Sequence, residues 1–148
     1  MCNKYIFSLT SIPSRIKGIE KTIDSLMNQT LKPEKIILNI PKKYNFRFNE
    51  YPDISALHIN LKKFTSKIII NIVDNDYGPG TKLLGITNSN VINVQEDNTF
   101  MILVDDDLVY KPYMLEYFDR CNSENYNNKC LVASFYCYNH NEIIIGQG

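Results

Sequence analysis

The sequence lacks tryptophan, has only two histidines, and carries no excess of either charge. Its 16 basic and 16 acidic residues give a formal net charge of zero, and no basic stripe is present. A nucleic-acid backbone is therefore not expected as a partner, because its recognition depends on clustered positive charge. No apolar run is long enough to span a membrane, and residues 5–9 are too few for the core of a signal peptide. We therefore expect a cytoplasmic protein without a membrane span.

The sequence also lacks the C-x-x-C pairs of a zinc site, since no two of its four cysteines have that spacing. They are Cys2, Cys121, Cys130 and Cys137. We expect these side chains to be buried or unreactive thiols in a reducing compartment. Asparagine, isoleucine and lysine are over-represented, so a single asparagine or lysine carries little information by itself.

The length of 148 residues fits a single domain over positions 1–148. Apolar runs predict strands at four places, residues 5–9, 35–40, 67–73 and 100–104. Helical spacing of apolar residues predicts helices within 16–27, 54–64 and 83–94. We expect a break in the last of these helices near Gly85. A fourth helix is expected to open at Lys111-Pro112, since proline is favoured in a first turn.

The end of the chain predicts a C-terminal hairpin. Residues 131–137 and 142–145 are apolar and flank the polar turn Tyr138–Asn141. Together with the alternating strands and helices, this pattern predicts an α/β fold. The expected architecture is a layered, mostly parallel sheet flanked by helices, with a hairpin at the C-terminus.

Three consecutive aspartates, Asp105, Asp106 and Asp107, follow the apolar run 100–104. In open α/β sheets, ligands bind where strands end at their carboxyl edge. Adjacent carboxylates repel one another unless a positive charge lies among them, and Mg²⁺ and Mn²⁺ prefer carboxylate oxygens. The alternative is an acidic turn that faces solvent, with Asp107 as the cap of the next helix.

Two other strand ends carry polar chemistry, in the segments 10–15 and 74–82. If the strands are parallel neighbours, both segments and the aspartates share one edge of the sheet. Two cations, backbone N–H groups and carboxylates are the parts that hold a diphosphate through a metal ion. The segment 74–82 could instead be a structural turn, since Gly78 and Gly80 give backbone freedom and Pro79 fixes φ.

Other phosphate-binding classes fit the sequence less well. A P-loop is excluded because no glycine precedes Lys82 and Leu83 stands where Ser or Thr binds Mg²⁺. Phosphotransferases with an Asp-x-Asp nucleophile and receiver domains place their acids after the first strand, whereas here the acids follow the fourth. Tyr77 and Tyr110 lie in the candidate loops, where either could stack on a base or serve in packing.

Five ordered motifs carry a resemblance to a known family, namely Ser8–Arg15, Gln29-Thr30, Leu38–Pro41, Asp76–Gly85 and Leu103–Tyr110. Over roughly residues 5–120 they resemble the donor-binding half of GT-A-fold glycosyltransferases, of a family 2-like bacterial and giant-virus type. The resemblance implies a Rossmann-like GT-A fold and sugar transfer from a UDP- or GDP-type nucleotide-sugar. It further implies Mn²⁺ or Mg²⁺ bound at an Asp-x-Asp motif. The acceptor could be a glycan, a protein or a small molecule.

The resemblance also implies roles for individual residues. Six would surround the nucleotide-sugar: Thr10, Ser11, Ile12, Arg15, Asp76 and Lys82. Asp105 and Asp106 would contribute to the same donor site, with Asp105 near the ribose or sugar. Asp107 would be the strongest metal ligand, shared with Asp105, and these two would carry the catalytic role. Which of Asp105 and Asp106 takes the first position of the motif is left open.

The acceptor site of such enzymes comes from their C-terminal half, whereas this sequence stops at Gly146-Gln-Gly148. We therefore expect a domain that is truncated before the acceptor-binding part. Two alternatives to sugar transfer follow from the same residues. The chain could be a non-catalytic nucleotide-sugar-binding module, or a nucleotidyl or phosphoryl transferase that uses the same carboxylate and metal chemistry.

Overall fold

The computed structural model describes residues 3–64, 66–91, 98–124, 133–138 and 142–147. Four strands form one parallel sheet: β1 (Lys4–Thr10), β2 (Lys35–Pro41), β3 (Ile68–Val73) and β4 (Thr99–Leu103). Their order across the sheet is β3-β2-β1-β4. The predicted α/β class with a parallel sheet is confirmed, and each of these strands lies within two residues of its expected position.

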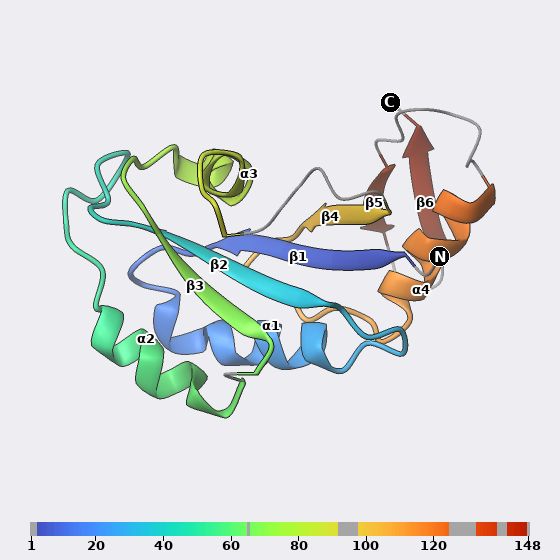
Figure 1. Cartoon of the computed structure of the whole chain (residues 1–148), viewed down its shortest axis with the longest axis horizontal. Helices are drawn as coiled ribbons and strands as arrows, with labels where there is room; N and C mark the ends of the chain where they lie inside the picture. Colours follow the sequence, from blue (N-terminus) through green and yellow to red (C-terminus); the bar gives the residue numbers. More distant parts are fainter. Residues whose placement is uncertain (1–2, 65, 92–97, 125–132, 139–141, 148) are drawn as a thin grey trace.

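Helices cover both faces of this sheet (Figure 1). On one face lie α1 (Ile19–Met27), which follows a short 3₁₀ turn, and α2 (Ile54–Leu61). The other face carries α3 (Thr81–Thr87), preceded by the 3₁₀ turn η3 (Gly78–Gly80). The crossover that leaves β1 therefore covers one face, and the crossover that enters β4 covers the other. β1 and β4 are neighbours, so the chain has a switch point between them.

The last helix, α4 (Met114–Glu124), lies beside the amino end of β1. There the Tyr5 hydroxyl donates a hydrogen bond of 2.7 Å to Asp119 Oδ1. Two further strands, β5 (Ala133–Tyr138) and β6 (Glu142–Gln147), form a separate antiparallel pair. Residues 139–141 of the turn expected between them lie outside the described residues. No helix in the described ranges has the length and apolar character needed to cross a membrane.

The strands are mainly apolar because helices cover both faces of the sheet. In β1, Tyr5, Phe7 and Leu9 pack into the larger core on the side of α1 and α2. The alternate residue Ile6 packs on the side of α3, against Ile86 and a smaller group of apolar residues. The helical spacing expected for residues 16–27 is also correct, because the apolar residues of that segment enter the larger core.

Helix α3 differs from the expectation, since it starts at Thr81 and ends at Thr87 without a break at Gly85. Gly85 is buried, and a Cβ built on it would lie 2.9 Å from Asn39 Oδ1 and 3.0 Å from Val73 Cγ1. Glycine is therefore used here for close approach of the helix to the sheet. Residues 92–94 of the expected helix lie outside the described residues. Helix α4 begins at Met114, after the expected Lys111-Pro112, because those residues form the preceding turn.

Replacing Gly85 with alanine should lower the unfolding free energy by about 1–3 kcal/mol, since the added methyl overpacks the contact with Asn39 and Val73. Gly18→Ala is the matched control, because a Cβ at Gly18 meets nothing within 4 Å. Urea denaturation of both variants checks the prediction. Equal stability of the two variants would contradict the close approach.

Candidate functional site

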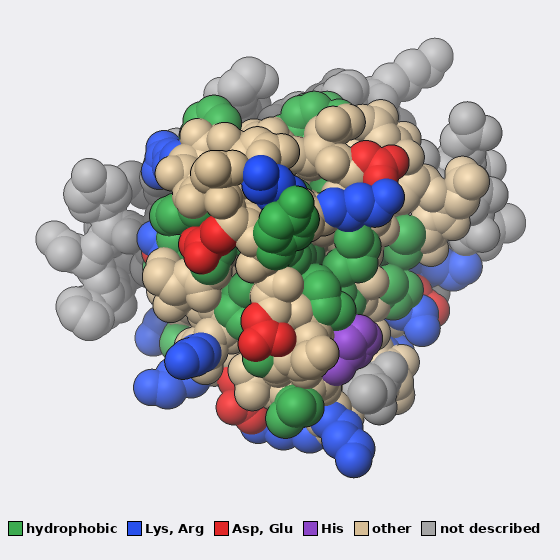
Figure 2. All heavy atoms as spheres, turned by 90° about the vertical axis from the view of Figure 1, so that its left-hand side faces the viewer, with side chains coloured by type: hydrophobic (Ala, Val, Ile, Leu, Met, Phe, Trp, Pro, Cys, Tyr) green, Lys and Arg blue, Asp and Glu red, His purple; other side chains and the backbone are tan. Residues whose placement is uncertain are grey.

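A cleft lies at the carboxyl edge of the sheet, between the segments that follow all four parallel strands. It is lined by residues from 10–15, 44–48, 76–82 and 104–106. Figure 2 views the side of the molecule that carries the loops after β2 and β3, where hydrophobic side chains gather in the middle of the face among basic and acidic ones. The cleft includes the switch point between β1 and β4, the usual place for a ligand in this class of sheet.

The structure brings all eight predicted nucleotide-sugar-binding residues to this cleft. They are Thr10, Ser11, Ile12, Arg15, Asp76, Lys82, Asp105 and Asp106. Asp107 lies beside the cleft and reaches it through Arg15, whose Nη2 is 3.1 Å from Asp107 Oδ2. Residues that are more than 90 positions apart in the sequence thus meet at one place.

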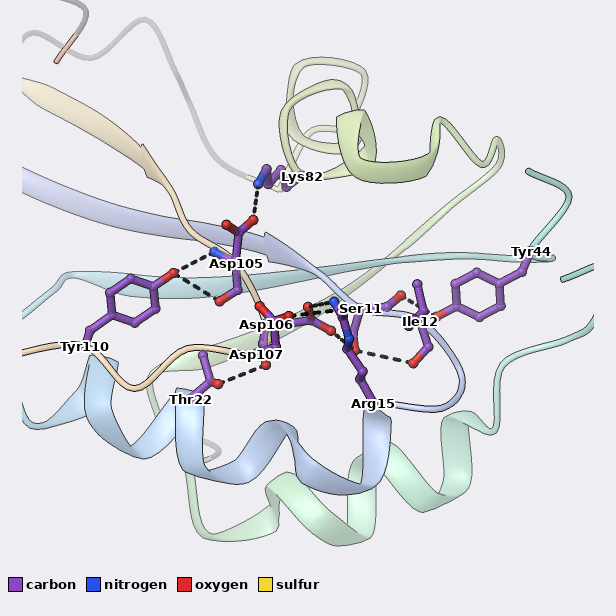
Figure 3. Close-up of polar contacts among 10 residues, drawn as sticks. All are labelled: Ser11, Ile12, Arg15, Thr22, Tyr44, Lys82, Asp105, Asp106, Asp107 and Tyr110. Atoms are coloured by element: carbon purple, nitrogen blue, oxygen red, sulfur yellow. Dashed lines mark hydrogen bonds and ion pairs between the residues drawn. The ribbon is translucent and has the colours of Figure 1, made fainter. Parts of the chain in front are cut away.

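The middle aspartate of the triplet is turned into the protein (Figure 3). Asp106 is 7% exposed, and its Oδ2 accepts a hydrogen bond of 2.5 Å from Ser11 Oγ. Its Oδ1 lies 3.0 Å from Arg15 Nη1. The hydroxyl of Thr22, in α1, donates to the Asp106 carbonyl at 2.9 Å. Asp106 therefore fastens the end of β4 to the loop after β1 and to α1.

The two outer aspartates face outward and each pairs with one cation. Asp105 is 59% exposed, and its Oδ1 lies 2.6 Å from Lys82 Nζ. Asp107 is 47% exposed and pairs with Arg15. The carboxylates of Asp105 and Asp107 are therefore accessible to an external ligand, whereas that of Asp106 is largely buried although the residue lines the cleft. The alternative of Asp107 as a helix cap is wrong, because α4 begins only at Met114.

The aspartates around Arg15 favour its charged form. The pKa of Arg15 is raised, first by its hydrogen bond to Asp106 and then by the charges of Asp106 and Asp107. Arg15 comes from the loop after β1 and Lys82 from the first turn of α3, so the cations approach the triplet from two elements. Three carboxylates face two cations, and this cluster keeps a net negative charge.

Tyr110 shapes the acidic turn through its hydroxyl group. The hydroxyl accepts from the Asp105 N–H at 2.7 Å and donates to the Asp105 carbonyl at 3.2 Å. The Tyr110 N–H donates to Ser25 Oγ in α1 at 3.0 Å. Burial raises the pKa of Tyr110 to about 12. Tyr110 thus holds the turn in place through hydrogen bonds to the backbone of Asp105. Neither Tyr110 nor Tyr77 is among the cleft-lining residues.

The segment 44–48 forms a wall of the cleft, and none of its residues is among the predicted site residues. The buried Tyr44 donates from its hydroxyl to the Ser11 carbonyl at 2.9 Å. Phe46 and Phe48 are exposed, and the Arg47 guanidinium lies 5.4 Å from the centre of the Phe46 ring. Aromatic residues in a loop directly after a central strand were the available signal for this wall.

Asp76 joins this wall to the turn after β3. Its Oδ2 accepts from the Phe46 N–H at 2.7 Å, and its Oδ1 accepts from the Gly78 N–H at 2.8 Å. Gly78 has a φ of +58°, and a Cβ there would lie 2.9 Å from the Phe46 ring. The segment 74–82 is therefore a structural turn that also lines the cleft, which combines the two expectations for it.

The cleft fits a metal ion only as a site shared with a ligand. Within the described residues, no group of three or more His, Cys, Asp or Glu side chains is arranged to hold an ion. Asp105 and Asp107 nevertheless offer two exposed carboxylates, and Mg²⁺ is commonly bound by one or two carboxylates together with substrate phosphates. The donor set therefore suits a metal–diphosphate complex better than a permanent metal centre.

Comparison with known proteins identifies no relative of this chain. No family model, curated protein or solved structure matches it. A functional assignment therefore depends on the geometry of the cleft and on the motifs that line it.

Asp106→Ala should lower the unfolding free energy by about 2–3 kcal/mol, because it removes the carboxylate partner of the buried Ser11 hydroxyl and one of the two carboxylates that pair with Arg15. Asp107→Ala is the matched control and should change stability by no more than about 0.5 kcal/mol, since its ion pair is half exposed. Chemical denaturation compares the two. A larger loss for Asp107→Ala would contradict the inward and outward arrangement of the triplet.

Raising the pH from about 10 to about 12 should destabilise the protein, because burial raises the pKa of Tyr110 to about 12 from its ordinary 10.0. Below this range tyrosine is protonated in both states, so this contribution to stability does not change. Within it only the unfolded state releases the proton. Tyr110→Phe should make the fall shallower by about 1–2 kcal/mol, measured by urea denaturation across the range. An unchanged slope would show that Tyr110 is not held in its neutral form.

Proposed function

We propose that this chain is a GT-A-like, Rossmann-type donor domain of a glycosyltransferase. It binds a UDP- or GDP-type nucleotide-sugar with Mn²⁺ or Mg²⁺ and transfers the sugar. One observation carries the proposal, namely that motif residues from separate parts of the sequence line one cleft at the carboxyl edge of the sheet. Parallel sheets of this class bind nucleotides at that edge.

The charge of the cleft supports a metal–diphosphate ligand. The cleft and its edge carry four carboxylates, those of Asp76 and the aspartate triplet. They carry three cations, Arg15, Arg47 and Lys82, so one negative charge is in excess. A bare diphosphate is repelled by such a site, whereas a divalent cation is attracted to it. Once the cation is bound, the local charge becomes positive and favours a diphosphate.

Lys82 and Arg15 lie where they can exchange their carboxylate partners for the phosphate oxygens of a ligand. Lys82 and Arg15 pair with Asp105 and Asp107, which are also the two exposed carboxylates. A divalent ion at these carboxylates weakens both ion pairs, and the released cations can then bind phosphate oxygens. Arginine suits this role because its planar fork binds two phosphate oxygens at once. When bound, the metal supplies Lewis-acid stabilisation of the nucleoside diphosphate leaving group.

The aromatic wall supports a nucleotide rather than inorganic diphosphate. Phe46 and Phe48 expose flat apolar rings at the cleft, next to Arg47. A nucleobase is the flat, partly apolar portion of a nucleotide-sugar and gains from stacking on such side chains. The cleft thus offers charged groups for the diphosphate and apolar groups for the base.

The chemistry on the acceptor side is assigned to no residue. Among downstream acids, Asp119 accepts hydrogen bonds from Tyr5 and Asn3 at the amino end of β1, away from the cleft. It therefore does not serve as a catalytic base at this edge. The proposed roles within the chain are donor binding and stabilisation of the leaving group, carried by Asp105, Asp107, Arg15 and Lys82.

A nucleoside diphosphate with Mn²⁺ should raise the melting temperature, since a ligand at a hundredfold excess over its dissociation constant stabilises a fold by about 2.7 kcal/mol. UDP, GDP and their sugar conjugates are tested by thermal shift with and without Mn²⁺. Asp107→Ala should lower the apparent affinity for the nucleotide with Mn²⁺ at least about tenfold, and the rise in melting temperature should be smaller. Asp74→Asn is the control, because Asp74 pairs with Lys42 and does not line the cleft.

Three outcomes separate the candidate functions. Absence of stabilisation by every nucleotide with Mn²⁺, or an equal response of wild type and Asp107→Ala, rejects the proposal. Donor binding without sugar transfer or donor hydrolysis favours the non-catalytic binding module. Binding of nucleoside triphosphates in preference to nucleotide-sugars favours a nucleotidyl or phosphoryl transferase.

A further inference from the structure

Three polar side chains are buried side by side on the face of the sheet that α3 covers. Ser8 in β1 and Asn39 in β2 are fully buried, and Asn71 in β3 is nearly so. We name Ser8, Asn39 and Asn71 the polar ladder. The buried apolar residues of this face, Ile6 and Ile37, pack with Ile86 of α3. Buried amide and hydroxyl groups in such surroundings are costly unless every donor has a partner.

The hydrogen bonds of the polar ladder run in one direction across three strands. Asn71 Nδ2 donates to Asn39 Oδ1 at 2.8 Å, and Asn39 Nδ2 donates to Ser8 Oγ at 2.9 Å. Ser8 Oγ then donates to the Lys82 carbonyl. Asn71 Nδ2 also donates to the Gly85 carbonyl at 3.0 Å. Both ends of the polar ladder therefore terminate on the backbone of α3.

These bonds matter for helix α3 because the helix is short and its apolar contact with the sheet is small. It has seven residues, too few to be stable as an isolated helix. Leu83 and Leu84 remain exposed, while Ile86 supplies the apolar contact with the sheet. Gly85 permits the close approach to Asn39 on which the bonds rely.

Lys82, whose carbonyl accepts the hydrogen bond from Ser8, also lines the cleft with its side chain. Ser8 holds the Lys82 carbonyl, and the side chain of Lys82 extends to Asp105. Resting on the proposed function for the identity of the ligand, we propose that Ser8, Asn39 and Asn71 are positioning residues. They set Lys82 where its ammonium group binds the diphosphate of the donor. They lie in the sheet beneath α3 and are not among the residues that line the cleft.

A purely stabilising role predicts a different pattern. If the polar ladder only stabilised the fold, its loss would affect ligand binding equally whether or not Lys82 is present. If it positions Lys82, its loss matters only while Lys82 is there to be positioned. A double-mutant cycle separates the two roles.

The first test measures the dissociation constants of UDP and GDP with Mn²⁺ by calorimetry. Ser8→Ala should weaken binding about fivefold, the effect of one lost hydrogen bond. In the Lys82→Met background, the same substitution should change binding by less than about twofold. Asn71→Ala, at the far end of the polar ladder, provides a second variant should Ser8→Ala fold poorly. Tyr5→Phe, which removes the bond to Asp119 at the amino end of β1, should leave binding unchanged.

The second test needs no ligand and measures the acetylation rate of individual lysines by mass spectrometry. Both Lys82 and Lys42 are ion-paired, but the Lys82 side chain is 22% exposed and that of Lys42 is 64% exposed, so Lys42 serves as the internal reference. Ser8→Ala should raise the rate at Lys82 at least about threefold and leave Lys42 unchanged.

The two tests distinguish failure of the proposed function from failure of the positioning role. If wild type binds neither UDP nor GDP, the proposed function fails, and the acetylation rates alone decide the role of the polar ladder. Equal weakening by Ser8→Ala with and without Lys82 overturns the positioning role while donor binding stands. An unchanged Lys82 acetylation rate in Ser8→Ala and Asn71→Ala overturns it as well.

Discussion

The contacts of Asp106 with Ser11 and Arg15 are the constraint on which the cleft depends. They join the end of β4 to the loop after β1, the two neighbouring strand ends at the switch point. The middle carboxylate is buried, whereas its two neighbours in the turn, Asp105 and Asp107, are exposed. Repulsion within the triplet is thereby reduced on the inner side by Arg15 and Ser11. A pair of accessible carboxylates remains on the outer side.

The two faces of the sheet hold their helices by different means. Toward α1 and α2, a large apolar core makes the packing depend on burial, which is strong and non-directional. Toward α3, a small apolar group is supplemented by Ser8, Asn39 and Asn71, whose hydrogen bonds specify one position of the helix. The face with less apolar contact is the one that presents Lys82. Geometric definition, rather than tightness of packing, is what a charged group at a binding site requires.

The strands and the main site residues could be predicted because their signals are local. Apolar runs marked β1 to β4. Because parallel strands end at the same edge of the sheet, the polar residues that follow them could be expected to lie together. The aromatic residues of 44–48 were visible in the sequence, but their place in the cleft was not, since it depends on Asp76, 30 positions away from Phe46 in the sequence. Asn39 and Asn71 were indistinguishable from a general excess of asparagine until the sheet set them side by side. The helix expected to break near Gly85 continues through that residue and ends at Thr87, and a tertiary contact, not chain flexibility, explains the glycine.

The double use of Asp76 has a consequence for the cost of binding. Because its two oxygens hold the backbones of Phe46 and Gly78, the segments 44–48 and 76–80 form one continuous wall before any ligand arrives. Loops that are ordered in advance lose little conformational entropy on association. A ligand that enters between this wall and the aspartate triplet therefore spends little of its interaction energy on ordering the chain. The affinity of the cleft then reflects the contacts themselves.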